Sequence, residues 1–485
     1  MSAFLELPIE ILHPIVLELG NGSNRKCLRS TCKGLSAVVE PILFSEIVLK
    51  TDSSALVWRS IPFCEALCRS EDAFRKDQRG LATYVRTLRV NYPYDDASQE
   101  ILDAWRDILP IALCKLVNLK SFSWEMSRNS QGMYDQVFEV ISKLPSLSEF
   151  TLAGELLGYS DTIRLDCLHN LRTLLINVRR FPNDGFEKNI FGPLTTTITN
   201  SPDIQTLQIL APYSPSKPCS FIDLFKSVLD ARRTPALKIK NLKVENLKMV
   251  VPVPAMIMPH LQCLSSLEVR SWYIGIGNFW NVLRTANVSL ESLIVVCDPD
   301  RTLLDYLSHF HSKLQVLQLS GTPAITFQES DELADLFFGS VLPIFAGSLR
   351  ELKIQSSYEG RWCIGMHNLE TLSSCTNLES LSVCLNGDEI VDVMGDVVDH
   401  AHSLPRLKSL YLSPTSTRSC RNAPCGPHLR MNYYTQMSRI LRETVENLQP
   451  TEAHVGTGLC ILPFFYTVCR TQDGSLKYEV EEKRR

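Results

Sequence analysis

The sequence has no long apolar run. No apolar segment reaches the roughly eighteen residues that a transmembrane helix needs, and the nearest one, GLCILPFFYTVC from Gly458, is interrupted by Pro463. The N-terminus has no basic region of the kind found in signal peptides, and it carries Glu6 and Glu10 within its apolar stretch. These absences predict a soluble intracellular protein, located in the cytoplasm, the nucleus or both.

An excess of charge of one sign is also missing. Lys and Arg number 49 and Asp and Glu 53, which gives a formal net charge of -4 among 485 residues. Nucleic acids and anionic membrane surfaces attract strongly basic proteins, so this balance predicts neither as a partner. Partners therefore have to be inferred from local features of the sequence.

Motifs for catalysis and metal binding are absent as well. The sequence contains no Walker A, HExxH or GxSxG motif. The nearest candidate for a metal site, CRNAPCGPH, offers Cys420, Cys425 and His428 without an evident fourth ligand, and a proline-rich loop is the better interpretation. We therefore predict a protein that is not an enzyme, with no catalytic residue, no metal and no cofactor.

The sixteen cysteines are mostly isolated in apolar segments, where reduced thiols pack as small hydrophobic side chains. This usage favours a reducing compartment over a disulfide framework. Cys64 and Cys68 would share one face of a helix, but no histidine lies nearby in the sequence. We interpret both as packing residues and not as nucleophiles.

A repeat extends through most of the chain. The pattern LxxLx[LIV], or a conservative variant of it, occurs twelve times, with its fourth position at residues 88, 122, 150, 174, 207, 242, 267, 293, 317, 352, 381 and 410. The end of each copy alternates apolar, polar and apolar residues, which predicts a strand with one buried face. Stretches with helical spacing lie between copies, such as those from Gln136, Phe221, Thr302, Asp331 and Ile390. One strand and one helix per repeat predict stacked units with a parallel sheet on one side and helices on the other.

Over roughly residues 81 to 415 the sequence resembles the leucine-rich-repeat family. The resemblance implies an α/β fold, a horseshoe-shaped solenoid with parallel strands on the concave face and helices on the convex face. The Asn or Cys that the family carries beyond each strand is nearly absent, with Asn386 as the one clear example, which implies an irregular solenoid. The alternative is an ordinary α/β domain with leucine-rich strands, but twelve copies in order disfavour it.

In such a solenoid the polar positions within and beside each strand core would line the concave face, Ser382 among them. Acidic and basic residues nearly balance there, which disfavours a reader of phosphorylated peptides or of a nucleic-acid backbone and favours binding of a protein target. The candidate target-binding residues are Arg89, Ser123, Glu125, Lys243, Arg270, Gln318, Lys353 and Tyr411.

Residues 4 to 49 precede the repeats and predict a short helical module. The segment FLELPIEILHPIVLEL is apolar around most of its helical circumference, so part of its surface should meet another body. We expect the chain to break at Gly20–Gly22 and again near Gly34. Pro14 falls inside the first helix, where it should kink or restart it.

These residues resemble an F-box. Leu7–Leu12 match the opening Leu-Pro-x-Glu-Ile/Leu-Leu of the family, Leu28–Lys33 match its Leu-Arg-x-x-Cys/Ser-Lys stretch, and EPILFSEIVL from Glu40 is similar to the exit and first strand of fungal members. Pro14 and Leu35, which stands where the family often has an aromatic residue, depart from the pattern. The resemblance implies docking on a Skp-type adaptor, and through it on a cullin-RING ubiquitin ligase, with target proteins bound by the repeats. The adaptor-contacting residues that it implies are Leu7, Pro8, Ile11, Leu12, Ile15, Leu28, Cys32 and Leu35.

The predicted organisation has three parts. They are an F-box-like module at residues 1–48, a solenoid at 49–415 with about twelve repeats from residue 81, and a C-terminal cap at 416–485. Within the cap, Thr435 begins a helical pattern and Asp473–Gly474 predict a hairpin turn. The alternative function is an interaction scaffold without a ligase link, in which the opening helices merely cap the solenoid.

Overall fold

We analysed a computed structural model of the chain. It describes residues 7–19, 22–50, 54–69, 80–91, 98–126, 133–155, 162–180, 185–212, 219–230, 235–250, 254–270, 276–297, 299–310, 313–321, 326–356, 358–415, 427–446, 459–462, 466–470 and 476–480. The chain divides into two compact units, residues 1–239 and 240–485, and each is described by itself.

Unit 1 begins with three helices, α2 (Ile9–Glu18), α3 (Gly22–Arg29) and α4 (Lys33–Leu43). Pro14 lies inside α2 and does not end it, so of the two predicted outcomes, a kink or a restart of the helix, the restart does not occur and the kink stays a prediction. The second break falls at residues 30–32, close to the predicted position near Gly34, because Cys32 accepts a hydrogen bond from the Leu35 amide and caps α4 at its N-terminus.

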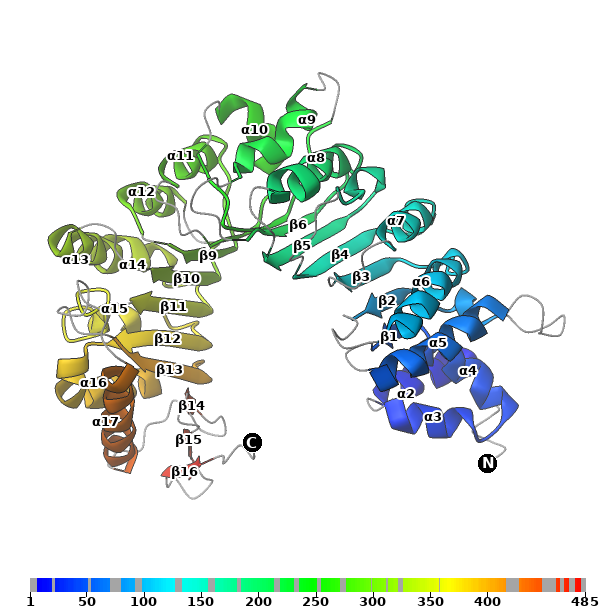
Figure 1. The fold of residues 1–485 in the computed structure, drawn as a ribbon. Coiled ribbons are helices and arrows are strands. Elements are labelled where there is room, and N and C mark those ends of the chain that lie inside the picture. Colours follow the sequence, from blue (N-terminus) through cyan, green and yellow to red (C-terminus); the bar gives the residue numbers. More distant parts are fainter. Residues whose placement is uncertain are drawn as a thin grey trace. The chain divides into compact units, whose positions relative to one another are not determined.

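Six parallel strands follow in chain order in unit 1. They are β1 (Glu46–Leu49), β2 (Thr87–Val90), β3 (Ser121–Met126), β4 (Glu149–Glu155), β5 (Thr173–Arg180) and β6 (Thr206–Leu210). The segments between them form α5 (Ser54–Arg69), η1 (Leu81–Thr83), α6 (Gln99–Cys114), α7 (Tyr134–Ser142), η3 (Leu165–Cys167), the π-helical η4 (Glu187–Phe191), α8 (Gly192–Thr199), η5 (Phe221–Phe225) and α9 (Lys226–Asp230). The helices α6, α7 and α8 cover one face of this sheet (Figure 1).

Unit 2 repeats the arrangement with eight parallel strands and ends in an antiparallel hairpin. The strands are β7 (Asn241–Glu245), β8 (Ser266–Arg270), β9 (Ser292–Val296), β10 (Val316–Gly321), β11 (Glu351–Ser356), β12 (Ser380–Leu385), β13 (Ser409–Pro414), β14 (Leu459–Leu462), β15 (Tyr466–Arg470) and β16 (Leu476–Val480). The helices are α10 (Pro254–Leu261), α11 (Gly277–Thr285), α12 (Arg301–His309), α13 (Phe327–Leu336), the π-helical η6 (Phe337–Val341), α14 (Leu342–Phe345), α15 (Leu369–Ser373), η7 (Gly387–Glu389), α16 (Ile390–Ser403) and α17 (Pro427–Glu446).

The repeat pattern positions the core. All twelve predicted fourth positions lie in strands β2 to β13, and each of these side chains is at most 3% exposed. Neighbouring repeats within a unit align them, as in the pairing of Leu88 with Phe122 and of Leu317 with Leu352. Burial of one large apolar side chain contributes about 1.5–3 kcal/mol, so this column is a main source of stability. The leucine-rich-repeat-like α/β architecture is thus confirmed within each unit.

Two parallel strands lie outside the twelve predicted ones. β1 occupies the residues that resemble the first strand of fungal F-box proteins, and it pairs with β2. β14 continues the parallel sheet after β13, and β15 and β16 form the predicted hairpin.

One main-chain pattern recurs at the start of the strands. The carbonyl of Arg86, directly before β2, accepts hydrogen bonds from the amides of Lys120 and Ser121, at the start of β3. In unit 2 the carbonyl of Gln315 accepts in the same way from Arg350 and Glu351. We call this series of doubly used acceptors the carbonyl ladder. It satisfies the amides at the start of strands β2 to β6 and β8 to β13 from the carbonyl before the preceding strand.

The Asn expected beyond the strand acts once in the predicted way. Asn386, after β12, accepts a hydrogen bond from the amide of Gly360 through Oδ1 and donates through Nδ2 to Glu389. It therefore satisfies a backbone group in the turn of the preceding repeat. Among the helices of the described ranges, none is both long enough and apolar enough to cross a bilayer.

Candidate functional surfaces

The helical module at the start of unit 1 has a small core. Leu12 and Val16 of α2 pack against Val38, Val39 and Ile42 of α4. The C-terminal end of α2 is held by Arg25, whose Nε and Nη2 donate to the carbonyls of Val16 and Leu17 at 3.2 and 2.9 Å. These bonds satisfy carbonyls that have no partner within the helix.

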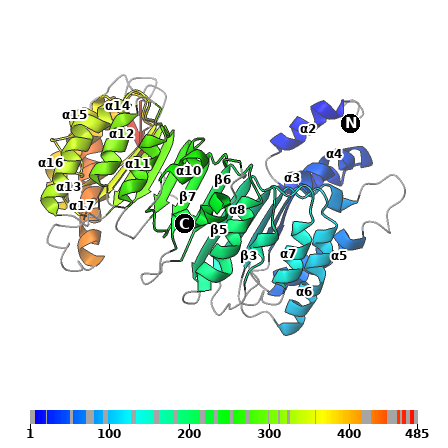
Figure 2. The same cartoon turned by 90° about the horizontal axis from the view of Figure 1, so that it is seen from above.

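The rest of α2 is left uncovered. Ile11 is 50% exposed, Ile15 39% and Leu17 47%, and both prolines, Pro8 and Pro14, are exposed as well. Figure 2 places α2 at the end of unit 1, clear of the strands. A short helix that buries two side chains and exposes three large aliphatic ones carries an unusually apolar surface, which is typical of an interaction site.

The eight predicted adaptor-contacting residues divide by burial. Pro8, Ile11 and Ile15 are exposed, whereas Leu7, Leu28 and Cys32 are half-buried. Leu12 and Leu35 are each only 5% exposed, so we correct their assignment from partner contacts to buried residues, and Leu12 belongs to the core of the module. The sequence could not separate the two groups, because a helix that is apolar around its circumference does not reveal which side packs.

In each unit, the strand residues that alternate with the buried ones point away from the helix-covered face. We call this surface the open face. On unit 1 it carries Arg89, which contacts Glu46 at 3.0 Å, and the exposed Glu125. Ser123 is half-buried, and the aligned residues on β4 to β6 are uncharged. Solvent-exposed ion pairs such as this one contribute little to stability.

The open face of unit 2 has more charged contacts. Glu268 lies between Lys243 and Arg270, 3.0 Å from the ammonium group and 2.5 Å from the guanidinium Nε, and its side chain is only 15% exposed. Gln318 donates to Glu351 of the next strand. Lys353 and Tyr411, which complete the predicted set, are half-buried. The predicted target-binding residues thus fall on both units, three on unit 1 and five on unit 2.

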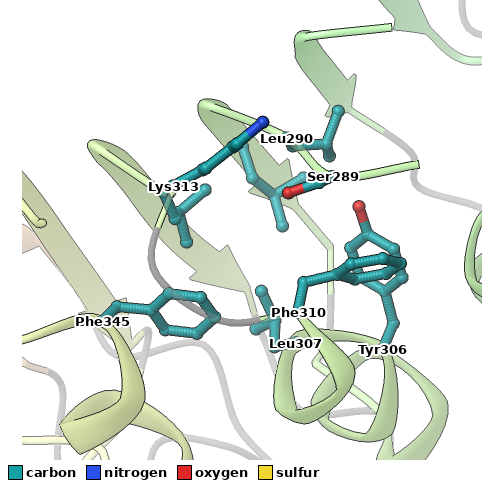
Figure 3. Close-up of a pocket in the computed structure, with 9 residues that line it drawn as sticks. Ser289, Leu290, Tyr306, Leu307, Phe310, Lys313 and Phe345 are labelled. Carbon is teal, nitrogen blue, oxygen red and sulfur yellow. The ribbon is translucent and has the colours of Figure 1, made fainter. Parts of the chain in front are cut away.

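A crevice opens on unit 2 between α12 and the helical segment that contains Phe345 (Figure 3). Its empty space is about 260 Å³, which includes space open to solvent, and Leu290, Leu307, Phe310 and Phe345 line it. The Tyr306 hydroxyl at its wall already donates to the Val288 carbonyl at 2.9 Å, and burial raises the pKa of this phenol. With Lys313 as its only other ionisable lining group, the crevice offers no acid–base pair.

One polar contact on the helical side has the residue types of a catalytic pair. Ser373 Oγ is in hydrogen-bond contact with His400 Nε2, between α15 and α16. The acidic residue next to His400 in the sequence is Asp399, and its pKa is raised by desolvation and by the negative charge of nearby Asp396. No carboxylate among the described residues is hydrogen-bonded to His400 to orient its ring, and this pair lies outside the crevice.

The thiols also lack the features of a nucleophile. Cys64 is buried in α5, and desolvation raises its pKa to about 12, whereas reactive cysteines have lowered pKa values. The side chains of Cys420, Cys425 and His428 lie outside the described residues. Within the described ranges no group of three or more His, Cys, Asp or Glu side chains could hold a metal ion.

Comparisons with known proteins give limited information. No family model matches the chain, and no curated protein matches it. A crystal structure of the Rad7 and Elc1 complex in yeast aligns with 77% of this chain and 87% of that chain, at 15% sequence identity and a TM-score of 0.37. A likeness of this size supports no functional conclusion.

Proposed function

We propose that this protein is a non-catalytic substrate-recognition subunit of an SCF-type cullin-RING ubiquitin ligase. In this proposal the helical module of residues 9–43 docks on a Skp-type adaptor, and the open faces of the repeats bind a target protein. The protein acts in the cytoplasm or the nucleus. It contributes to ubiquitin transfer by holding the target near the charged enzyme, which raises the effective concentration of the reacting groups.

The observation that carries the proposal is the uncovered surface of α2. Ile11 and Ile15 lie on the helix that resembles the start of an F-box, and they remain 50% and 39% exposed while Leu12 and Val16 fill the module's core. Apolar helix surfaces of this kind bind partners through a few anchors. The predicted contacts are therefore sharpened to Pro8, Ile11 and Ile15, with Leu17 added.

Co-purification of the full chain with a Skp-type adaptor tests this proposal. Ile11→Asp together with Ile15→Asp should reduce adaptor binding at least tenfold, because two anchors would carry charge into an apolar contact. The matched control is Ile111→Asp on α6, where an isoleucine is equally exposed, at 51%, but lies outside the module. If the unmodified chain does not bind, or if the double variant binds as well as the control does, the proposal fails.

The scaffold alternative has one observation in its favour. The Ser45 carbonyl, directly after α4 and its turn, accepts hydrogen bonds from the amides of Arg86 and Thr87 at 2.8 and 2.9 Å, so the module joins the sheet without a linker. A cap should be needed for the stability of the strands that it covers, whereas a docking module should be dispensable. Hydrogen exchange of β1 and β2 after removal of residues 1–43 separates the two functions: protection that persists favours docking.

A further inference from the structure

Lys353, Ser382 and Tyr411 form one row across three neighbouring strands on the open face of unit 2. The register of β11 and β12 pairs Lys353 with Ser382, and that of β12 and β13 pairs Ser382 with Tyr411. Neighbouring strands are about 4.8 Å apart, so the three side chains start within about 10 Å of one another. All three residues are half-buried, so each keeps part of its surface exposed. We call this set the Lys353 row.

The polar ends of the Lys353 row have no partner in the described part of the chain. Neither the Lys353 ammonium group nor the hydroxyls of Ser382 and Tyr411 make a hydrogen bond or an ion pair there. The polar groups around them are already paired: Glu351 accepts from Gln318, and Ser409 donates to Ser380 at 3.1 Å. The row therefore has unused capacity to donate hydrogen bonds.

The other cations of this open face differ from Lys353. Lys243 and Arg270 both contact the carboxylate of Glu268. Among the residues of this face on strands β7 to β13, Lys353 is then the cation that no carboxylate contacts. The nearest acid on its own strand is Glu351, two residues away and engaged by Gln318.

From this arrangement we propose that the Lys353 row binds one carboxylate group, supplied by an Asp or Glu side chain of the target protein. One ammonium group and two hydroxyls match the single charge and the acceptor-only oxygens of a carboxylate. A phosphate carries nearly two charges and is normally bound by several Arg or Lys side chains, which this row lacks. The inference deepens the proposed function, on which it rests only for the statement that the target is a protein.

The neighbouring strands add an apolar contact to the site. Gln318 on β10 pairs with Lys353 on one side and with Ile294 on β9 on the other. Ile294 therefore lies two strands, or about 10 Å, from Lys353. Val316 stands on the same face next to it, and both side chains are half-buried. The target segment should thus present an aliphatic or aromatic side chain about 10 Å from its carboxylate.

Selection of random 12-residue peptides displayed on phage against the full chain tests the site. The selected peptides should share an Asp or Glu near an apolar residue, and changing that acid to Asn or Gln should weaken binding about tenfold or more. Lys353→Met should weaken binding by the same factor and Tyr411→Phe by about threefold. Lys353→Glu should reverse the preference to Lys or Arg. The matched control is Lys313→Met, at an exposed lysine of the crevice, which should leave binding unchanged.

Several outcomes would overturn the site. The selection could yield no binder, or binders without a shared acidic residue. The selected peptides could bind the Lys353→Met variant as tightly as they bind the unmodified chain. Phosphoserine peptides could bind more than tenfold tighter than the same peptides with Glu. Adaptor co-purification with Lys353→Met should remain intact. If the unmodified chain does not bind the adaptor, the proposed function is wrong. If the selected peptides share no acidic residue, only the proposed carboxylate site is wrong.

Discussion

The open faces of the two units use the same strand positions for different chemistry. Unit 1 places one exposed ion pair, Arg89 with Glu46, beside mostly uncharged residues. Unit 2 sets Glu268, only 15% exposed, between two cations and leaves Lys353 without a contacting acid. The buried fourth positions of the repeats are large and apolar in both units. The buried strand positions of the repeats thus determine the fold of both units. The open-face positions that alternate with them differ between the units and determine what each open face can bind.

The cores of the two units also differ, and a core substitution should give the largest effect. Phe150 of β4 belongs to an aromatic cluster with Phe122 and Phe138, whereas unit 2 has leucine at the aligned strand positions. Phe150→Ala should destabilise unit 1 by about 3–5 kcal/mol, because it removes a buried ring and leaves a cavity.

Hydrogen exchange on the full chain checks the effect of this substitution by region. Protection should fall in β3 to β5 and stay unchanged in β9 to β12, because stacked repeats transmit stability mainly to their neighbours. Leu317→Ala in β10 is the matched change in unit 2 and should give the reverse pattern. Equal losses of protection in both units after either substitution would mean that the units unfold as one body.

A smaller loss of stability should distinguish the ion pairs of the two open faces. Glu268→Gln leaves Lys243 and Arg270 close together without their shared carboxylate, and it should cost unit 2 about 1–2 kcal/mol. Glu46→Gln removes the exposed pair of unit 1 and should cost less than about 0.5 kcal/mol. Urea denaturation at low and high salt measures both. Equal costs would remove the distinction that we draw between the faces.

The last effect, a dependence of stability on pH, should be common to both units. Burial raises the pKa of Cys64 in unit 1 to about 12 and that of Cys375 in unit 2 to about 11. In the unfolded chain each thiol ionises near pH 8.5, so each contributes stability that is present below that pH and is lost as the pH rises towards the folded-state pKa.

Between pH 8 and 9.5 the contribution of Cys64 to unit 1 and that of Cys375 to unit 2 should therefore each fall by about 1 kcal/mol. Denaturant titrations of the full chain at the two pH values, followed by region with hydrogen exchange, measure this loss. Cys64→Ala should reduce the pH dependence of unit 1 alone and Cys375→Ala that of unit 2 alone. A loss confined to one unit in the unmodified chain would contradict this account.

The sequence predicted most of the fold because its signals were local. Leucine alternation placed twelve strands, and helical spacing placed α7, α12 and α16. The hairpin β15–β16 followed from the Asp-Gly signal in the same way. Pro14 left a kink and a restart of α2 as alternatives, and α2 is not restarted there, because a proline inside a helix removes one hydrogen bond without necessarily ending the helix.

The candidate sites were less predictable because they depend on the register between distant segments. The contact of Glu268 with Lys243 follows from the pairing of β7 with β8, and Ser382 joins Lys353 and Tyr411 only through two further pairings. The repeats are 24 to 35 residues apart and irregular, so sequence spacing does not reveal which side chains become neighbours. Leu12 and Leu35 were assigned to a partner for the related reason that apolarity alone does not tell core from surface.

The carbonyl ladder has a consequence for how such a chain could lengthen. Each of the strands β2 to β6 and β8 to β13 is aligned by one main-chain carbonyl directly before the preceding strand, as with Arg86 for β3 and Gln315 for β11, so side-chain identity at the joint is immaterial. The intervening segment can then vary in length without shifting the alignment. The segment that runs from the start of one strand to the residue before the next strand is therefore a self-contained structural unit. Duplicating or deleting such a segment would preserve both neighbouring joints, which offers a route by which binding faces of this kind can be recombined.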